Sequence, residues 1–295
     1  MNFTLFCLAT SLEDLRERLS NIVVGINSKG EYVFVKDLKI EGSLMALLKD
    51  AYYPNLVQTL ENNPAIIHGG PFANIAHGCN SVIATKMALK MGDYAITEAG
   101  FGADLGAEKF LDIKCRMAGL TPDAVVVVAT VRALKMHGGL AKTELGNEDL
   151  VALEKGIPNL LRHVSNIKNV YKLPCVVAVN RFPTDTDSEI DFIIEKCREL
   201  GVNTVLSTVW AEGGKGGVEL AEEVVALCER ENNFTLSYSD DESIEQKIRS
   251  VAQKIYRACD VELTPAAKKQ VAALEEAKTQ IADMKTQLKE SAAAQ

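Results

Sequence analysis

The segment from His68 to Ser81 combines three glycines, two histidines and two asparagines immediately ahead of a helical pattern. Glycines let a ligand approach the main chain, and the free N–H groups at a helix N-terminus favour an anion. The segment therefore indicates an anion-binding loop. A tight turn whose histidines bond to backbone carbonyls would produce the same pattern, and the residues of this segment alone do not separate the two interpretations.

Two further glycine-rich segments do not match the common nucleotide motifs. Gly100, Gly102 and Gly106 do not have the G-x-G-x-x-G spacing of a dinucleotide fingerprint. The run Gly213 to Gly217 contains a lysine, but no hydroxyl residue follows that lysine to hold magnesium, so it is not a Walker A loop. No H-E-x-x-H, G-x-S-x-G or Cys/His metal spacing occurs, which removes the commonest metalloprotease and hydrolase interpretations and predicts no metal site.

Aromatic and amide side chains follow two apolar runs. In the loop from Asn180 to Thr186, an amide could read the edge of a base and Phe182 could stack on a ring. Asn and Pro are also ordinary turn residues, so this loop is a weak indication by itself. Trp210, the only tryptophan, lies in a glycine loop with little core around it, which favours a ring-stacking role over core packing.

These segments must be positioned by a sheet. Short apolar runs alternate with helical patterns from Pro64 onward, which is typical of β-α-β units and predicts an α/β fold with a doubly wound, mostly parallel sheet. Ligands bind outside the carboxyl ends of such strands, so the loops after the runs are the candidate sites. The expected strands are Ala65–Ile67, Tyr94–Thr97, Ala124–Ala129, Pro174–Val179 and Thr204–Ser207. The run Ala124–Ala129 has no polar alternation, which predicts a central strand covered on both faces.

The ends of the chain carry other patterns. The apolar N-terminal run predicts a buried helix or strand end, and two β-branched runs around a turn between residues 21 and 36 predict a hairpin. After Thr264, a helix with an apolar seam only about two heptads long is expected to pack on its own domain rather than form a coiled coil. The expected divisions are 1–60, 61–260 and a helical tail at 261–295.

Bulk composition excludes several classes of protein. Apolar residues make up 47% and charged residues 24% of the chain, as in soluble globular proteins. A net charge of −8 argues against nucleic acid as a partner, and no apolar stretch is long enough to span a bilayer. The seven cysteines are scattered singly, which favours a reduced, cytoplasmic protein with buried thiols.

Six strings together closely resemble formate–tetrahydrofolate ligase, in that family's order and at about its spacing. They are Asn55–Glu61, His68–Ser81, Thr97–Lys109, Val128–Gly139, Phe182–Thr186 and Trp210–Gly217. The resemblance runs from about Cys7 to about Leu274 and implies a P-loop NTPase-like fold. It also implies the family's reaction, in which ATP phosphorylates formate to formyl phosphate and the N10 amine of tetrahydrofolate attacks its carbonyl carbon.

The resemblance assigns roles residue by residue. Phe101 and Gly102 would lie beside formyl phosphate, and Phe182, Pro183 and Trp210 would form the aromatic walls around the pterin or purine ring. Asn180 would face the adenine, with Gly213 and Gly214 in the nucleotide site, and His77 and Asn80 would border the same cleft without an assigned step.

The sequence also departs from the family. The P-loop and the basic residues that grip formyl phosphate lie upstream of this sequence in the family, and a further domain lies beyond it, so we expect a central segment with most ligands of ATP and Mg²⁺ missing. The tail after Leu274 is expected to diverge. The implied partners are formate, tetrahydrofolate and ATP, a separately encoded N-terminal half and a second copy of the chain. The alternatives are a non-catalytic folate or nucleotide-binding protein and a truncated product without a role.

Overall fold

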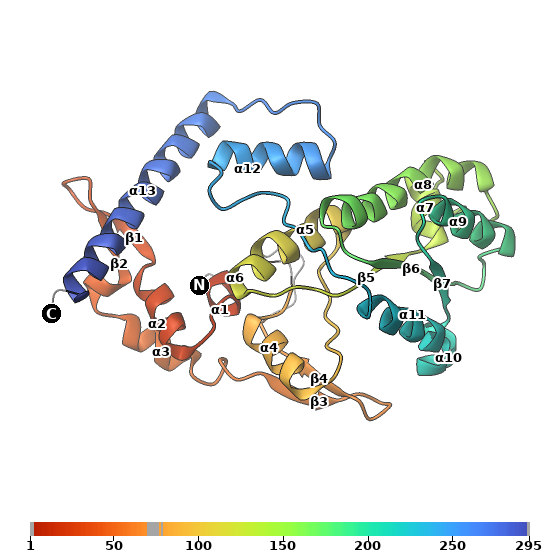
Figure 1. The fold of residues 1–295 in the computed structure, drawn as a ribbon, viewed down its shortest axis with the longest axis horizontal. Coiled ribbons are helices and arrows are strands. Elements are labelled where there is room, and N and C mark those ends of the chain that lie inside the picture. The colour runs from red at the N-terminus through yellow and green to blue at the C-terminus, as the bar shows by residue number, and fades with distance from the viewer. Residues whose placement is uncertain (1–2, 70–76, 78, 294–295) are drawn as a thin grey trace.

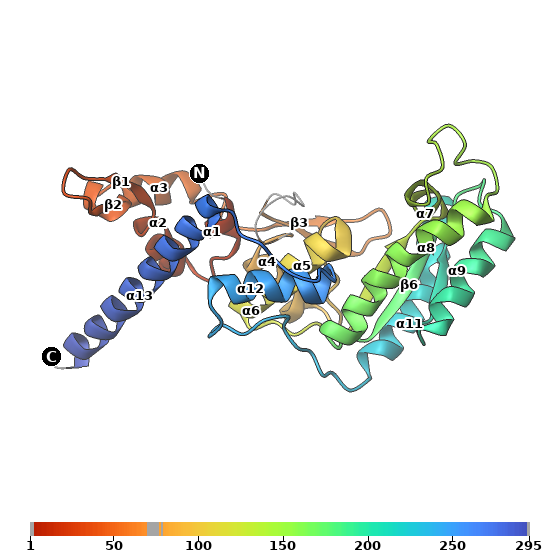
Figure 2. The same ribbon diagram turned by 90° about the horizontal axis from the view of Figure 1, so that it is seen from above.

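A computed structural model of the chain describes residues 3–69, 77 and 79–293. The parallel sheet lies at one end of an elongated molecule, and the N-terminal elements and the last helix lie at the other (Figures 1 and 2). The N-terminal elements are α1 (Phe3–Cys7), α2 (Leu12–Ser20), β1 (Val23–Ile26), β2 (Tyr32–Phe34), the 3₁₀ turn Val35–Leu38 and α3 (Glu41–Leu48). This end has its own small core, formed around Phe6, Cys7, Leu15, Leu19 and Leu48.

The expected hairpin and the buried N-terminal run are both confirmed. β1 pairs with β2 in antiparallel register, and Asn27 closes the turn through its side-chain oxygen. Cys7 is fully buried in α1. At the start of α2, the Asp14 carboxylate accepts the Thr10 N–H, and the Ser11 hydroxyl accepts the Asp14 N–H. Local sequence is therefore sufficient to begin that helix.

A three-stranded parallel sheet positions the central part of the chain. Its strands, in the order β5-β6-β7, are β5 (Val125–Ala129), β6 (Cys175–Asn180) and β7 (Thr204–Ser207). Helices α8 (Leu150–Ser165) and α9 (Asp187–Glu199) contact one face, and α11 (Val218–Cys228) covers the opposite face (Figure 1). An α/β architecture with a parallel sheet is thereby confirmed, whereas the P-loop NTPase-like arrangement remains a prediction.

The structure corrects the position of one strand. β6, not β5, is the central strand, and its residues from Val176 to Val179 are almost completely buried. Within the described part of the chain, β5 pairs only with β6, and Val128 is 60% exposed. An apolar run records the tendency to be buried, but the order of strands depends on distant pairings that composition does not encode.

Two expected strands of the parallel sheet were also wrong. β4 (Pro64–Ile67) pairs antiparallel with β3 (Asn55–Gln58) in a separate hairpin. The connection between them is too short for the crossover that parallel neighbours need, and Asn62 supplies its left-handed turn with φ of +66°. Tyr94–Thr97 forms no strand and leads as irregular chain toward the next helical stretch.

Helical segments connect the strands. α4 (Val82–Met91) follows Ser81, and a long helical stretch with wide turns comprises Gly102–Gly106, α5 (Ala107–Lys109), Phe110–Cys115 and α6 (Arg116–Ala118). The segment Thr130–Gly139, directly after β5, is mostly helix α7 (Val131–His137). Helix α7 approaches α8 so closely that a Cβ at Gly156 would lie only 1.8 Å from the Leu134 carbonyl oxygen.

The remaining elements follow β7. They are α10 (Val209–Glu212), the 3₁₀ turn Gly213–Gly217, α12 (Ile244–Ser250), the wide turn Val251–Ile255 and α13 (Pro265–Ala293); a similar wide turn, Asn166–Val170, follows α8. Helix α13 begins at Pro265 as expected, with the Thr264 hydroxyl accepting the Ala267 N–H. It contacts α12, partly through Glu275, which accepts the Ile244 N–H. Leu274 on the apolar seam is 57% exposed.

Two features of the whole chain bear on its class. All seven cysteines are free thiols; five are buried, Cys228 is half-buried and Cys259 is exposed. Among the described residues, no helix combines the length and the apolar character needed to cross a membrane.

Candidate functional site

Three segments meet the carboxyl edge of the parallel sheet. The register pairs Ala129 with Val179 and Asn180 with Ser207, so the three strands end side by side. Helix α7 begins directly after β5, the loop from Arg181 to Thr186 follows β6, and α10 follows β7. The sequence therefore correctly placed the loops after β6 and β7 at one edge of the sheet. The structure adds the first turn of α7, which follows β5, to the same edge.

Phe182 sits in a tight turn held by Asp185. The Phe182 N–H donates to Asp185 Oδ2 at 2.8 Å, and the Asp185 N–H donates to the Phe182 carbonyl at 3.0 Å. The guanidinium carbon of Arg132, on α7, lies 4.8 Å from the centre of the Phe182 ring. Arg132 also donates from Nη2 to Thr184 Oγ1 at 3.1 Å. One face of the half-buried Phe182 ring is thus covered by a cation, and Pro183 beside it is exposed.

A buried ion pair supports this turn from below. Lys135 Nζ lies 2.8 Å from Glu189 Oε1, and both side chains are 0% exposed. Lys135 also donates to the Asn147 carbonyl at 2.7 Å, while Glu189 accepts the N–H groups of Asp149 and Thr186. Burial raises the pKa of Glu189, but these hydrogen bonds outweigh burial and hold the pKa below its ordinary value. The pair therefore ties α7, the chain ahead of α8 and the start of α9 together.

Two polar atoms in the Phe182 turn have no hydrogen-bond partner among the described residues. They are Arg132 Nε and Asp185 Oδ1, and both are buried. Asp185 is only 5% exposed. Burial raises the pKa of its carboxyl, even though the hydrogen bond from the Phe182 N–H favours the charged form. Neither residue was singled out from the sequence, although a basic residue just after a strand end was an available signal for Arg132.

Trp210 is presented to solvent at the same edge. It lies in α10 and is 81% exposed, as the glycine-loop argument expected. The following glycine loop receives a side chain from far along the sequence: Glu61 Oε1, beside the β3–β4 turn, accepts the Gly214 N–H at 2.7 Å. A Cβ at Gly214 would lie 2.1 Å from Glu61 Oε2, so a larger residue there would push the Glu61 carboxylate away from this N–H.

Phe101 and Gly102 begin the long helical stretch. Gly102 has φ of +72°, a conformation that favours glycine, and Phe101 is 86% exposed. Within the described residues, no ring contact joins Phe101, Phe182 and Trp210. The structure therefore brings Phe182 and Trp210 to one sheet edge, while a shared site with Phe101 remains a prediction.

His77 and Asn80 belong to a buried cluster around Lys114. Lys114 Nζ donates to Asn80 Oδ1 and to Thr85 Oγ1, both at 2.8 Å, and to Cys79 Sγ at 3.4 Å. Lys114 is 0% exposed and makes no ion pair within the described part, and burial lowers its pKa. His77 is also 0% exposed, and neither ring nitrogen has a hydrogen-bond partner among the described residues; burial, and then Lys114, lower its pKa to about 4. Both bases are thereby biased toward the neutral form.

The other histidine of this segment behaves differently. His68 Nδ1 lies 2.6 Å from Ser81 Oγ, and Nε2 lies 2.8 Å from the Ala51 carbonyl. Ser81 in turn accepts the Ala84 N–H at the start of α4. The turn interpretation of the segment therefore fits His68, whereas for His77 it remains a prediction.

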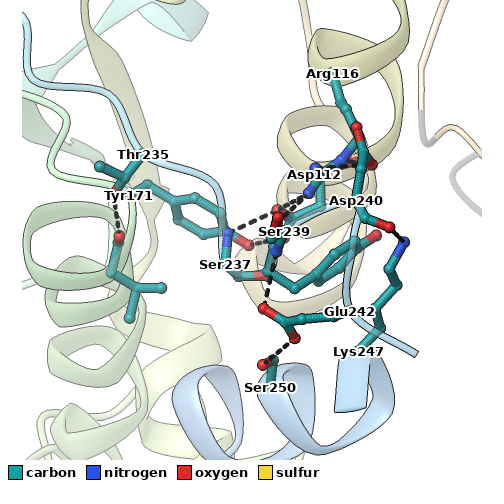
Figure 3. Close-up of polar contacts among 12 residues, drawn as sticks. Asp112, Arg116, Tyr171, Thr235, Ser237, Ser239, Asp240, Glu242, Lys247 and Ser250 are labelled. Carbon is teal, nitrogen blue, oxygen red and sulfur yellow. Dashed lines mark hydrogen bonds and ion pairs between the residues drawn. The ribbon is translucent and has the colours of Figure 1, made fainter. Parts of the chain in front are cut away.

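Asp112 forms a second buried hub, shown in Figure 3. Its carboxylate accepts the Tyr171 hydroxyl at 2.9 Å and the Ser237 hydroxyl and N–H at 2.6 and 2.8 Å (Figure 3). Arg116 lies 3.6 Å away on the same helix. The hub fastens the chain before α12 to the helical stretch. Burial, and then Asp112, raise the pKa of nearby Glu108 to about 7.

Histidine, cysteine, aspartate and glutamate are the side chains that usually bind a metal ion. Among the described residues, no group of three or more His, Cys, Asp or Glu side chains is arranged to hold a metal ion.

Comparison with known families agrees with the resemblance noted from the sequence. The sequence model of formate–tetrahydrofolate ligase matches residues 3–293. The match continues through the tail after Leu274, where we expected divergence, so that expectation was wrong. In the tail only Ala277–Gln280 resembles a short string of the family, because a composition rich in alanine, lysine and glutamate is common to many helices.

Proposed function

Since the chain belongs to the formate–tetrahydrofolate ligase family, we propose that the carboxyl edge of its parallel sheet binds the folate and nucleotide substrates of that reaction. Members of this family use ATP to join formate to tetrahydrofolate, a reaction of one-carbon metabolism. In this proposal Phe182, Pro183 and Trp210 stack on the pterin, and Asn180, Gly213 and Gly214 contact the nucleotide. Phe101 and Gly102 approach formyl phosphate.

The observation that carries the proposal is the register of β6 and β7. Asn180 and Ser207 are paired at the strand ends, so the Phe182 turn and the Trp210 helix leave the sheet next to one another. Ligands bind at this edge of parallel sheets because the loops and helix N-termini converge there. An exposed tryptophan and a half-buried phenylalanine are suited to stacking on a flat ring.

His77, Asn80 and Lys114 have a different part in the proposal. Their cluster is buried and lacks a carboxylate among the described residues, and burial lowers the pKa of both His77 and Lys114. We assign it to shaping the cleft and assign it no proton-transfer step. Mg²⁺ would arrive with the ATP phosphates, which are its usual ligands in such sites.

A second candidate function is supported by one feature of the sequence. The 295 residues contain no G-x-x-x-x-G-K-[ST] motif, and a phosphate clamp is the part on which phosphoryl transfer depends most. A folate or nucleotide-binding protein without turnover would keep the stacking edge and lack this clamp. The two candidate functions share the pocket and differ in catalysis. Only the ligase would depend on a separately encoded N-terminal half or on a homo-oligomer.

Trp210 fluorescence tests the pocket directly. Titration with 5-formyltetrahydrofolate, corrected for inner-filter absorption, should quench the emission because Trp210 is the only tryptophan. Phe182→Ala should weaken the apparent affinity about tenfold, which corresponds to about 1.4 kcal/mol of stacking.

Phe34→Ala is the matched control. Phe34 also lies beneath a cation, with Lys36 Nζ 4.8 Å from its ring centre, but it belongs to the N-terminal hairpin. This variant should bind the ligand as the unchanged protein does. Emission that stays flat up to millimolar ligand, in protein shown to be folded by circular dichroism, would refute the proposed pocket.

A further inference from the structure

Next to the Phe182 turn, one buried hydrogen-bond donor and one buried acceptor have no partner among the residues that the structure describes. Arg132 Nε comes from α7, and Asp185 Oδ1 comes from the loop after β6. Buried polar atoms nearly always have a partner, either in the protein, in ordered water or in a ligand. Two such atoms from different elements beside one aromatic ring point to a ligand edge that supplies both partners.

Other groups near the turn are already engaged. The second carboxylate oxygen of Asp185 accepts the Phe182 N–H, and Arg132 Nη2 donates to Thr184. Lys135 is held by Glu189 and the Asn147 carbonyl. Among the described residues Arg132 makes no ion pair within 4 Å, although its charge is close enough to lower the pKa of the Asp185 carboxyl. A ligand edge placed between the two side chains would supply a partner to each of them.

The chemistry of these atoms selects a kind of ligand. A carboxylate oxygen accepts from a ring N–H or an exocyclic amine, and a guanidinium N–H donates to a ring carbonyl. A flat heterocycle that stacks beside Phe182 and carries an amine and a carbonyl on one edge would satisfy both. The 2-amino-4-oxopyrimidine edge of a reduced pterin has this pattern.

We propose that Asp185 and Arg132 read the 2-amino-4-oxo edge of the pterin, with Asp185 accepting from the amine side and Arg132 donating to the carbonyl. This inference rests on the proposed folate site, and it makes the two residues determinants of ring specificity. They act together with the stacking ring, since both are fixed to the Phe182 turn by the contacts described above.

A change on the ligand tests the inference without altering the protein. Binding of 5-formyltetrahydrofolate and of its 2-desamino derivative would be compared by isothermal titration calorimetry. We expect the amino compound to bind at least about tenfold more tightly, because a site built to hydrogen-bond a group rejects an analogue that lacks it. Equal binding of both compounds would overturn the inference while leaving the folate site intact, whereas binding of neither would refute the proposed function itself.

Variants then assign the effect to the residues. In Asp185→Asn, the amide oxygen should keep accepting the Phe182 N–H, so the amide nitrogen takes the place of Oδ1. This variant should reduce the discrimination between the two compounds to about twofold or less. Arg132→Lys loses the Nε–H and should weaken both compounds by a similar factor of about ten.

Asp187→Asn and Arg181→Lys are matched controls, since these residues form an exposed ion pair beside the same loop, with side chains 84% and 38% exposed. They should bind both compounds as the unchanged protein does. Unchanged discrimination in folded Asp185→Asn, or a similar loss in the controls, would exclude the proposed role.

Discussion

Glu189→Gln is expected to destabilise the fold strongly, by leaving the Lys135 ammonium buried without its counter-charge. Both side chains are 0% exposed and their charged atoms are 2.8 Å apart. Removing one partner of a buried ion pair typically costs about 3–5 kcal/mol, because the remaining charge keeps its desolvation penalty. Gln keeps one acceptor oxygen, so it can retain either the Asp149 N–H or the Thr186 N–H, and the loss includes one backbone hydrogen bond together with the charge.

An exposed pair on the same helix isolates the effect of burial. Lys196 Nζ and Glu199 Oε1 are 2.6 Å apart, but their side chains are 31% and 54% exposed. Glu199→Gln should cost less than about 1 kcal/mol, because water screens and solvates the remaining charge. The short distance is common to both pairs, so a difference between the two variants can be attributed to burial.

Urea denaturation followed by circular dichroism measures both free energies of unfolding. The double variant Lys135→Met with Glu189→Gln should lose less than the sum of its single variants, since it leaves no unpaired charge. If Glu189→Gln cost less than about 1 kcal/mol, like the surface control, the ion pair would not be the element that holds α7 to α9.

Three further outcomes are expected. Glu108→Gln should stabilise the protein at pH 8 and have little effect at pH 4 in thermal denaturation, because a carboxyl whose folded pKa is raised from 4.5 to about 7 loses stability as the pH rises through that window; the opposite pH dependence would contradict the assigned burial. Glu61→Ala should free the Gly214 N–H and strengthen ADP binding in calorimetry, with Glu31→Ala as a control in the other hairpin; unchanged ADP affinity would show that Glu61 does not compete with the nucleotide. Protein consisting of these 295 residues should form no 10-formyltetrahydrofolate from ATP, formate and tetrahydrofolate above background, because it lacks the phosphate clamp; turnover near that of family enzymes, in a preparation free of host ligase, would contradict this expectation.

Local patterns in the sequence were sufficient for most elements of the parallel sheet. Cys175–Asn180 and Thr204–Ser207 are strands close to the expected limits, and α9 begins at Asp187 directly after a Thr186 capping box. These features depend on neighbours along the chain, namely apolar runs and side-chain caps. The family could also be identified from the sequence, because its strings occur in order along the chain.

Pairing partners were decided by tertiary structure. Ala65–Ile67 was expected in the parallel sheet and pairs instead in a hairpin, and Val125–Ala129 was expected at the centre and lies at an edge. A short β-branched run is compatible with several sheet positions. Which position it takes depends on strands that are distant in sequence, and hydrophobicity alone does not identify them.

The same limit applies to the candidate site. The sequence by itself determined the exposed ring of Trp210 and the Phe182 turn, because glycine, proline and aromatic residues at a strand end have local consequences. Only the tertiary structure placed Arg132 over Phe182 and buried Lys114, Lys135 and Asp185. A charged side chain is ordinarily expected at the surface, and it can be buried only where groups from distant segments supply its hydrogen bonds, so its position follows from the assembled fold.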